Sequence, residues 1–432
     1  MKSNSWGRYF GITTFGESHG KAMGLVLEDI TPGIDFPYDK LKTALKKRKP
    51  GQSEFSSSRN EPDNFEILSG VWKGKTTGMP ICIIFPNRDA RSSDYEIIKN
   101  TFRPGHADFT FFKKFKIYDY RGGSRASGRE TISRVAAGEL VSFLLKDIKI
   151  ELYAIQIGKI RAKNINLPVQ NKLHWPDDNL QQLEHYLKEI KTQKNSVGGI
   201  IEAKIVNAPI GLGDPVFEKL DANLSKAILS LGAVKGIEFG DGFNLASLKG
   251  SEANDQIDKN DFLSNHCGGI QGGISNGNDI VFRFVVKPTP SIQIPQKTIT
   301  HNNEPVKIKL RGRYDICIVP RIIPAAEAMI KLVLADALAF QKLISNKNKT
   351  LPELREAIDK IDEDILLALA RRNKISQAIG NRKRQKNIGV TDKEREIQLL
   401  KNILEKAATL NLSKTTVEKI WQAIIKESKL QQ

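Results

Sequence analysis

The sequence predicts an α+β domain followed by a smaller all-α module of three helices. In residues 7–342, short β-rich runs such as 80–85 and 280–286 alternate with glycine-rich turns and a few helical stretches, a mixture typical of α+β proteins. A polar stretch at 345–349 ends this pattern. Beyond it, apolar residues recur every three or four positions, which indicates amphipathic helices.

The length of 432 residues exceeds what one hydrophobic core usually serves. Two domains, or one large domain with an appendage, both fit that length. The polar stretch places the boundary, and Thr350 with Glu353 forms a capping-box pattern just after it. We therefore expect a first domain over residues 1–344, a linker over 345–350 and a helical domain over 351–432.

Two helices are expected in the first domain. One follows Arg129, where apolar residues recur at helical spacing: Ile132, Val135, Ala136, Leu140, Phe143 and Leu144. The other runs from about Ala325 to Leu343. Both have enough apolar positions to be at least half buried.

In the helical domain, one amphipathic helix extends from residue 351 to about 386, and two shorter ones cover about 392–409 and 413–428. The first would be roughly 50 Å long at 1.5 Å per residue. A compact globule of this domain's size has a radius of gyration of about 12 Å. The long helix must therefore pack against a partner chain or another domain.

Composition excludes several classes of protein. Apolar residues make up 40% of the chain, but no run approaches the roughly 18 needed to span a membrane. The N-terminus lacks the apolar segment of a secretory signal. The three cysteines, Cys82, Cys267 and Cys317, are odd in number and share no metal-ligand spacing. We expect a reducing, cytoplasmic compartment and no metal site.

The net charge of +18, from 67 basic and 49 acidic residues, is the strongest bulk signal. It fits a nucleic acid, an anionic membrane surface or small anionic substrates drawn into basic clefts. Only the positions of the basic residues can separate these alternatives.

Residues 16–20 read GESHG and match the G-x-S-x-G elbow of serine hydrolases. That elbow joins a central strand to a helix, and its acid and histidine follow later in the chain. Here one strand at most precedes the motif. Ser18 and His19 are also adjacent, so on a strand they would point to opposite faces and could not act as nucleophile and base.

His19 is the more informative residue, because the chain has only six histidines and another, His106, lies in a second polar motif, RPGHAD at 103–108. Histidine titrates near neutral pH, so it suits proton donation to a leaving group or a cofactor.

Arginines concentrate in loops near these histidines. Residues 121–130 read RGGSRASGRE and lead directly into the helix that carries Arg134, and residues 46–51 form a second basic cluster. Glycines let backbone N–H groups approach an anion, and arginine binds phosphate or carboxylate bidentately. The alternative, RNA binding by an RGG-like tract, fits less well because those tracts are repetitive and disordered.

Four motifs together resemble the chorismate synthase family: GESHG at 16–20, RPGHAD at 103–108, GRET at 128–131 with RVAAG at 134–138, and GRYD at 312–315. The resemblance covers about residues 6–342. It implies a β-α-β sandwich fold, a homotetramer, and reduced FMN as cofactor. The implied reaction is 1,4-elimination of phosphate from 5-enolpyruvylshikimate 3-phosphate to give chorismate, without net oxidation. The resemblance leaves open whether NAD(P)H or an external reductase reduces the flavin.

The same resemblance assigns roles to residues. His19 would assist departure of the phosphate, His106 would protonate or neutralise the reduced flavin, and Asp315 with Ser18 would handle the proton at flavin N5. Substrate anions would be bound by four arginines: Arg48, Arg103, Arg129 and Arg134. FMN would contact Arg125, Ala126, Ser127, Gly272, Lys287, Pro288, Thr289, Pro290, Ser291 and Arg313.

The chain departs from the family pattern at three places. Tyr314-Asp315-Ile316 stands where the family usually has His-Asp-Pro, Cys267 where it usually has alanine, and Glu54 where it often has a basic residue. The chemistry expected of Asp315 is unaffected, and the loop from Arg48 to Glu54 is the least secure assignment.

The helical domain resembles the all-helical chorismate mutases, which convert chorismate to prephenate as intertwined dimers. Arg372 interrupts an apolar stripe, where a charge is costly unless a ligand or acid meets it. Eight positions match the family's site: Arg355, Arg372, Lys383, Asp392, Arg395, Glu396, Ser428 and Gln432. The alternative is a regulatory or dimerisation module without catalysis.

Overall fold

The computed structural model describes residues 3–57, 61–88, 98–117, 119–259, 261–310, 312, 314–344, 351–385, 389, 391–409 and 412–431. The chain forms two compact units, Met1–Lys342 and Leu343–Gln432. The proposed linker at 345–350 lies outside the described residues.

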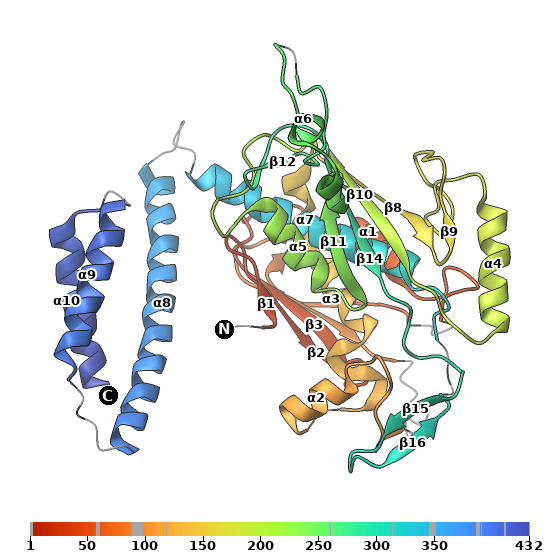
Figure 1. Ribbon diagram of the computed structural model, residues 1–432, viewed down its shortest axis with the longest axis horizontal. Coiled ribbons are helices and arrows are strands. Elements are labelled where there is room, and N and C mark those ends of the chain that lie inside the picture. The colour runs from red at the N-terminus through yellow and green to blue at the C-terminus, as the bar shows by residue number, and fades with distance from the viewer. Residues whose placement is uncertain are drawn as a thin grey trace. The chain divides into compact units, whose positions relative to one another are not determined.

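Two antiparallel five-stranded sheets make up the first unit (Figure 1). One has the order β1-β2-β3-β7-β4, with bounds Ser5–Trp6, Ile12–Gly16, Ala22–Leu27, Ile81–Pro86 and Glu66–Ser69. The other has the order β11-β14-β10-β8-β9, with bounds Val234–Phe239, Ile280–Val286, Gly199–Val206, Lys149–Ile157 and Ile160–Arg161. Buried and part-buried residues alternate along β7 and β10, as expected for sheets with one face on a core.

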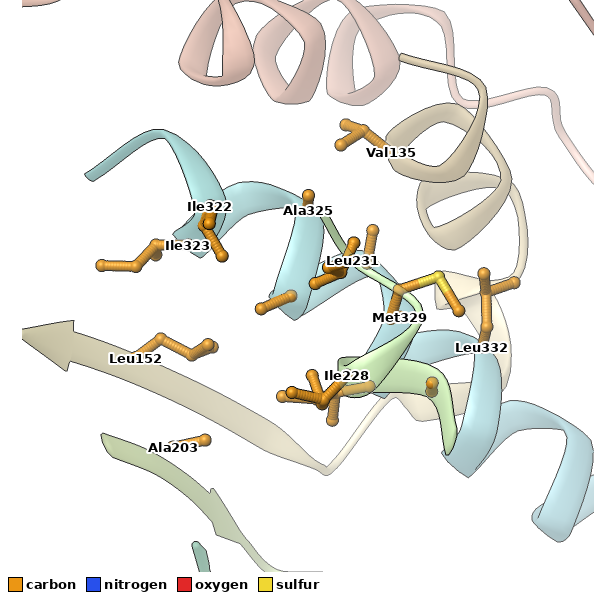
Figure 2. Packing of buried hydrophobic residues seen from close by; sticks show 14 of the residues in the cluster. Val135, Leu152, Ala203, Ile228, Leu231, Ile322, Ile323, Ala325, Met329 and Leu332 are labelled. Carbon is orange, nitrogen blue, oxygen red and sulfur yellow. The ribbon is translucent and has the colours of Figure 1, made fainter. Parts of the chain in front are cut away.

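Helices fill the space between the sheets. The Ser133 hydroxyl of α3 (Thr131–Leu140) donates to the Gly24 carbonyl of β3 at 2.9 Å. On the other side, α7 (Val319–Ile344) packs against α3, and a Cβ placed on Gly138 would lie 2.7 Å from Ala328. Figure 2 shows α7 passing over Leu152 and Ala203 of the second sheet. The unit is therefore the β-α-β sandwich that the family resemblance implies.

A single hydrophobic core joins these layers. It includes Leu25 and Ile83 from the first sheet, Ile201 and Phe282 from the second, and Leu332 from α7, each at most 1% exposed. Since both sheets and the helices between them share one core, loops at the sheet ends are held at fixed distances from one another.

The remaining elements surround this sandwich. The helices are α1 (Tyr38–Arg48), α2 (Asp108–Phe115), α4 (Leu180–Thr192), α5 (Leu220–Leu229) and α6 (Gly250–Ala253). Three hairpins pair β5 (Val71–Trp72) with β6 (Lys75–Thr76), β12 (Ile270–Gln271) with β13 (Ile274–Ser275), and β15 (Gln296–Ile299) with β16 (Pro305–Ile308). Short 3₁₀ turns cover Arg121–Ala126, Gly128–Glu130, Ser142–Leu145 and Gly242–Ser247.

Two predicted helix boundaries differ from the structure. Helix α7 begins at Val319, six residues before the predicted start, and contains Pro324. The first turn donates to the Ile318 carbonyl through the Arg321 and Ile322 amides, so the helix is established before the proline is reached. The helix after Arg129 ends at Leu140, and Phe143 and Leu144 lie in a separate 3₁₀ turn.

The second unit consists of three helices, α8 (Leu351–Gln385), α9 (Lys393–Thr409) and α10 (Lys414–Leu430). Helix α10 packs against both α8 and α9, and Ser413 caps it by accepting from the Thr416 amide. The apolar stripe of α8 is largely solvent-exposed in this single chain: Ile358, Ile361, Ile365, Ile375 and Ile379 are 44–63% exposed.

In the part of the chain that the structure describes, no helix combines the length and the apolar character needed to cross a membrane.

The contact between α3 and α7 gives a testable prediction. Gly138→Ala places a Cβ 2.7 Å from the Ala328 backbone, which cannot move aside as a flexible side chain can. Overpacking of this kind costs about 1–3 kcal/mol, which outweighs the roughly 1 kcal/mol that alanine gains in helix propensity. We expect a lower unfolding free energy by urea denaturation. Gly232→Ala is the control, because nothing lies within 4 Å of its Cβ; equal effects in the two variants would contradict the packing argument.

Candidate active sites

Ser18 and His19 lie in the turn between β2 and β3, which pair antiparallel. Both side chains are buried, with 0% and 9% exposure. A turn between antiparallel strands is not the strand-to-helix elbow of a hydrolase. The GESHG motif therefore serves to hold His19 in the site.

The two predicted histidines meet the same loop at consecutive glycines. A Cβ on Gly122 would lie 2.2 Å from His19 Cδ2 and 2.8 Å from Ser18 Oγ, and a Cβ on Gly123 would lie 2.9 Å from His106 Cε1. Both glycines have positive φ, +61° and +82°. Because neighbouring Cα atoms are about 3.8 Å apart, the two imidazoles converge on one place. Any side chain at either glycine would displace a histidine.

His106 belongs to a buried network with Arg103 and Asp108. Arg103 donates to both Asp108 oxygens, at 2.7 Å from Nε and 2.8 Å from Nη2. His106 Nδ1 lies 2.7 Å from the same carboxylate. The bidentate pair fixes the carboxylate, and the carboxylate fixes the orientation of the imidazole.

The charge state of His106 follows from this setting. Burial lowers the pKa of His106, and Arg103 and Lys287 lower it further, while the hydrogen bond to Asp108 opposes them. For Asp108, burial alone would raise the pKa, but Arg103 and His106 hold it well below its usual range. At neutral pH His106 is thus neutral in the protein alone, beside a carboxylate that stays ionised. An arriving anion would raise its pKa and favour proton uptake.

A second buried cluster joins two predicted arginines through one carboxylate. Asp63 accepts from Arg48 Nη2 at 2.7 Å through one oxygen and from Arg129 Nη1 through the other. Their side chains are each 2% exposed. Burial lowers the pKa of Arg48 to about 10, with Asp63 opposing and Arg129 adding to the shift.

The same region contains a further ion pair. Arg321 Nη1 lies 2.5 Å from Asp315, whose other oxygen accepts from the Ser57 amide at 2.8 Å. Arg321 lies close enough to lower the pKa of Arg48. The cluster thus has five charged side chains: Arg48, Arg129, Arg321, Asp63 and Asp315. Three cations and two anions give it a net charge of +1 in a buried setting. Such a surplus favours the binding of an anion.

Asn87 connects this arginine cluster to the His19 turn. Its carbonyl oxygen accepts from Arg129 Nε at 3.0 Å, and its amide donates to the Glu17 and Gly20 carbonyls at 3.0 and 2.9 Å. The histidines and the buried arginines therefore form one continuous site.

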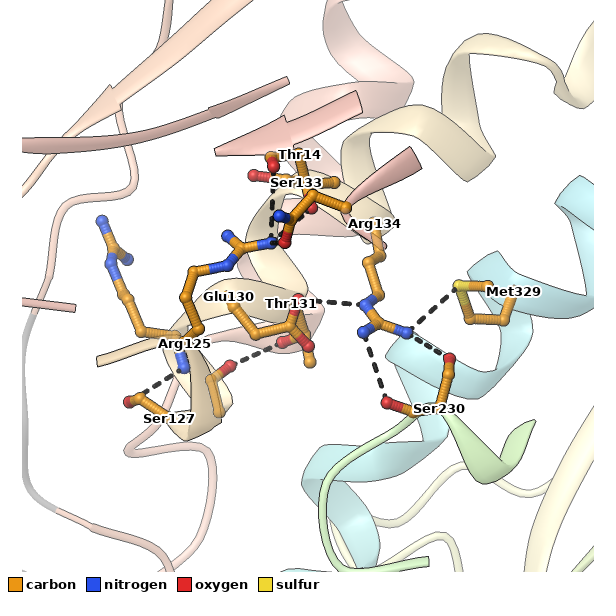
Figure 3. Close-up of polar contacts among 12 residues, drawn as sticks. Thr14, Arg125, Ser127, Glu130, Thr131, Ser133, Arg134, Ser230 and Met329 are labelled. Atoms are coloured by element: carbon orange, nitrogen blue, oxygen red, sulfur yellow. Dashed lines mark hydrogen bonds and ion pairs between the residues drawn. The ribbon is translucent and has the colours of Figure 1, made fainter. Parts of the chain in front are cut away.

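Arg125 and Arg134 are directed differently (Figure 3). Arg125 Nη2 donates to Thr14 Oγ1 at 2.6 Å, which holds it on β2 beside the His19 turn. Arg134 instead donates to Glu130 at 3.0 Å and to the Ser230 hydroxyl at 2.5 Å. Arg134 thus reaches the end of α5, and none of its described bonds joins it to the Asp63 cluster.

The other predicted cofactor residues fall in three places. Lys287 Nζ donates to the Gly105 carbonyl at 2.6 Å. Pro288, Thr289 and Pro290 line a cavity of about 300 Å³ with Pro104 and Gly105, and Ser291 is buried beside them. Ala126 is part-buried and Ser127 caps the next turn by accepting from the Arg129 amide. Gly272 lies in the β12–β13 turn with open space around it, and Arg313 lies outside the described residues.

Three charged residues of the site were missed from sequence: Asp63, Asp108 and Arg321. Asp108 could have been predicted from the sequence, because it ends the RPGHAD motif two residues after His106. Asp63 carries no local signal, because it lies in an irregular segment and its partners Arg48 and Arg129 are 15 and 66 residues away. Arg321 carries none either, because its partner Asp315 precedes the helix, six residues away.

In the second unit, the structure brings Arg372 and Ser428 together. Arg372 Nη1 donates to Ser428 Oγ and, at 3.4 Å, to the Ile424 carbonyl. Lys383 lies on the same helix as Arg372 and is part-buried. Arg372 thus lies between α8 and α10 with two polar partners, as a charge in an apolar stripe requires.

The other predicted mutase residues lie around this contact. Glu396 pairs with Lys429 at 2.8 Å, and Asp392 accepts from the Arg395 amide at 3.0 Å at the start of α9. Arg355 is exposed on α8, and the Arg395 side chain is exposed on α9. Gln432 lies outside the described residues.

Comparison with known proteins identifies both units. The family model described as chorismate synthase matches residues 10–339. The chain belongs to the chorismate synthase family. The model described as chorismate mutase type II matches residues 354–432. The predicted fusion of these two enzyme families is thus confirmed, and the chain is a bifunctional enzyme of the shikimate pathway.

Relatives support the first assignment. A chorismate synthase from Flavobacterium psychrophilum is 45% identical over 354 residues, which covers 80% of this chain and all of that protein. One from Syntrophus aciditrophicus is 44% identical over 353 residues, with the same coverage. A crystal structure of chorismate synthase superposes with a TM-score of 0.59 and 29% identity, over 82% of this chain and 98% of that one. The predicted fold is confirmed by this match together with the mutase family model.

The Arg103–Asp108–His106 network of the chorismate synthase unit gives the second prediction. Asp108→Asn removes the charge that accepts two guanidinium bonds and leaves Arg103 buried without its counter-ion. We expect a loss of about 3–5 kcal/mol in unfolding free energy. The pKa of His106 should also fall further, because the carboxylate that raises it is lost.

Histidine NMR titration and chemical denaturation measure both effects. Asp147→Asn, at an exposed aspartate, is the control. A His106 pKa that stays the same or rises in Asp108→Asn would contradict the proposed network.

Proposed function

We propose that the first unit removes phosphate from 5-enolpyruvylshikimate 3-phosphate by 1,4-elimination to form chorismate, and that the second unit rearranges chorismate to prephenate. The observation that carries the first assignment is the convergence of His19 and His106 on Gly122 and Gly123, beside buried arginines with surplus positive charge. A phosphorylated dicarboxylate is an anion that such a site would bind.

Reduced FMN is the cofactor that fits this site. Gly122 and Gly123 let both imidazoles lie directly against the loop backbone, which places the two proton-transfer groups that the flavin chemistry needs close together. The Thr289 hydroxyl is buried and has no hydrogen-bond partner among the described residues, so a ligand group can supply one. Arg125, Lys287 and the 288–291 segment would hold the flavin and its phosphate. When bound, reduced FMN would donate electron density to the substrate transiently and recover it, so that phosphate is lost without net oxidation.

The protein's own groups have separable tasks. Arg48 and Arg129, fixed by Asp63, would bind and orient substrate anions, so they need no reorganisation during the reaction. His19 would donate a proton to the departing phosphate. His106, neutral in the protein alone, would take up a proton next to anionic flavin, and Asp315 would hold or move the proton at flavin N5.

The mutase reaction needs no covalent intermediate, so positioning and electrostatics would carry it. Arg372 would bind a carboxylate of chorismate. Lys383 and Gln432 would donate to the ether oxygen whose bond breaks, with Arg355 from the partner chain completing the site.

An intertwined dimer of the second unit is part of this proposal. The apolar stripe of α8, 44–63% exposed at its isoleucines, is the surface that a second copy would cover. We also propose a tetramer through the first unit and a cytoplasmic location. NAD(P)H or an external reductase would reduce the flavin.

The assignment is tested by mixing the purified chain with reduced FMN and the shikimate phosphate ester. Phosphate and prephenate should both appear. His19→Asn should lower phosphate release by about 10²–10⁴-fold, the usual contribution of a general acid. His185→Asn, at an exposed histidine paired with Glu189, is the control and should leave the rate unchanged. No phosphate release by the unmodified chain would refute the synthase assignment.

The two activities should be separable. Arg372→Ala should abolish prephenate formation and leave phosphate release near normal, because Arg372 contacts only second-unit residues among those described. Arg371→Ala, at the adjacent exposed arginine, should affect neither activity. A tail that only regulates or dimerises predicts that the unmodified chain releases chorismate and forms no prephenate.

A further inference from the structure

A cavity outside both proposed active sites lies between α1, α3 and α7 of the first unit. Its volume is about 330 Å³, within the range of small-molecule sites. Each helix contributes an apolar side chain to its wall: Ala44, Val135 and Ala328. Figure 2 shows Val135 projecting from α3 toward the start of α7. The rest of the wall carries charges of both signs.

The inner charges have a negative surplus. Lys331 Nζ lies 3.1 Å from Glu139 and 2.9 Å from Glu327. Burial alone would lower the pKa of Lys331, but the two carboxylates raise it, so the ammonium stays charged. One ammonium between two carboxylates leaves a net charge of −1. Since their side chains are only 9–33% exposed, this charge is poorly screened.

The outer charges have the opposite surplus. Lys40, Lys47 and Asp39 line the cavity from α1 and are solvent-exposed. Lys40 and Lys47 are seven residues apart, about two helical turns, so they share a face. Two ammonium groups and one carboxylate give a net charge of +1. The cavity is therefore negative inside and positive at its rim, with an apolar surface between.

We propose that this cavity binds a small zwitterion of the α-amino acid type. Its ammonium group is directed to Glu139 and Glu327, its carboxylate to Lys40 and Lys47, and its apolar body to the alanine and valine side chains. A ligand with one charge only would satisfy one end of the cavity and leave the other without a partner.

The cavity between α1, α3 and α7 is lined by residues close in sequence to arginines of the proposed synthase site. Lys47 directly precedes Arg48 on α1, Val135 directly follows Arg134 on α3, and Pro324 lies three residues after Arg321 on α7. A ligand that bridges these helices changes the equilibrium between their arrangements, and by linkage the substrate changes the affinity for that ligand equally. Binding itself does not depend on the proposed function; the coupling does.

The binding test uses the full chain and isothermal calorimetry. L-Alanine, L-leucine and L-phenylalanine share one zwitterionic head and differ in size. Removing the ammonium or carboxylate of leucine gives 4-methylpentanoate or 3-methylbutylamine, and the matching pairs for the other two are propanoate with ethylamine and 3-phenylpropanoate with phenethylamine. We expect at least one amino acid to bind about tenfold or more tightly than both of its analogues, since each lost charge-assisted bond costs at least that factor. The proposal is overturned if none does.

Variants then locate the site. Lys47→Ala and Glu327→Gln should each weaken binding by about tenfold. Lys46→Ala, a neighbouring lysine of α1 that does not line the cavity, should bind as the unmodified chain does. Equal affinity in all three variants would overturn the location. Saturating amino acid should also shift the KM of phosphate release; an unchanged KM with binding intact would overturn the coupling alone.

Discussion

The synthase site depends on one carboxylate shared by two buried guanidiniums. Asp63 contacts Arg48 with one oxygen and Arg129 with the other, and burial of either guanidinium at 2% exposure without such a partner would destabilise the fold. The carboxylate neutralises only one of the two charges. Asp63 therefore lowers the free-energy cost of burying the two guanidiniums and still leaves one positive charge for a ligand. Its hydrogen bonds also fix the orientation of both guanidiniums. Asn87 extends this order to the turn that carries His19.

The Asp63 bridge also explains the arrangement of the helices. Arg48 ends α1, Arg129 lies two residues before α3, and Arg321 lies in the first turn of α7. Their charges meet at one end of the layer between the sheets, where helix termini place polar groups beside the core. At the same time, the apolar faces of these helices form that core. The packing of the core thus determines the spacing of the charges. The cavity of the further inference is lined by the same three helices.

Several residues of the candidate site could be predicted from the sequence, because they stand in short polar motifs that are recognisable without knowledge of the fold. His19, His106, Arg48 and Arg129 stand in dense polar motifs, and the structure brings them into one site. Asp63 could not be found in that way, because a single aspartate in an irregular segment has no periodicity and its role exists only through contacts with distant residues. The start of α7 was placed too late for a related reason: Pro324 suggests a helix start, but the five residues before it already form the first turn.

The burial of these arginines favours one of the interpretations that the net charge of +18 left open. A nucleic-acid surface needs exposed lysines and arginines, because phosphodiester charges lie on the outside of a thick polymer. Here three arginines of the polar motifs are buried: Arg48, Arg103 and Arg129 are 2–5% exposed and already bonded to carboxylates. A polymer backbone could not reach them, whereas a small anion entering the site could. These three arginines therefore fit small, multiply charged ligands better than a nucleic-acid partner.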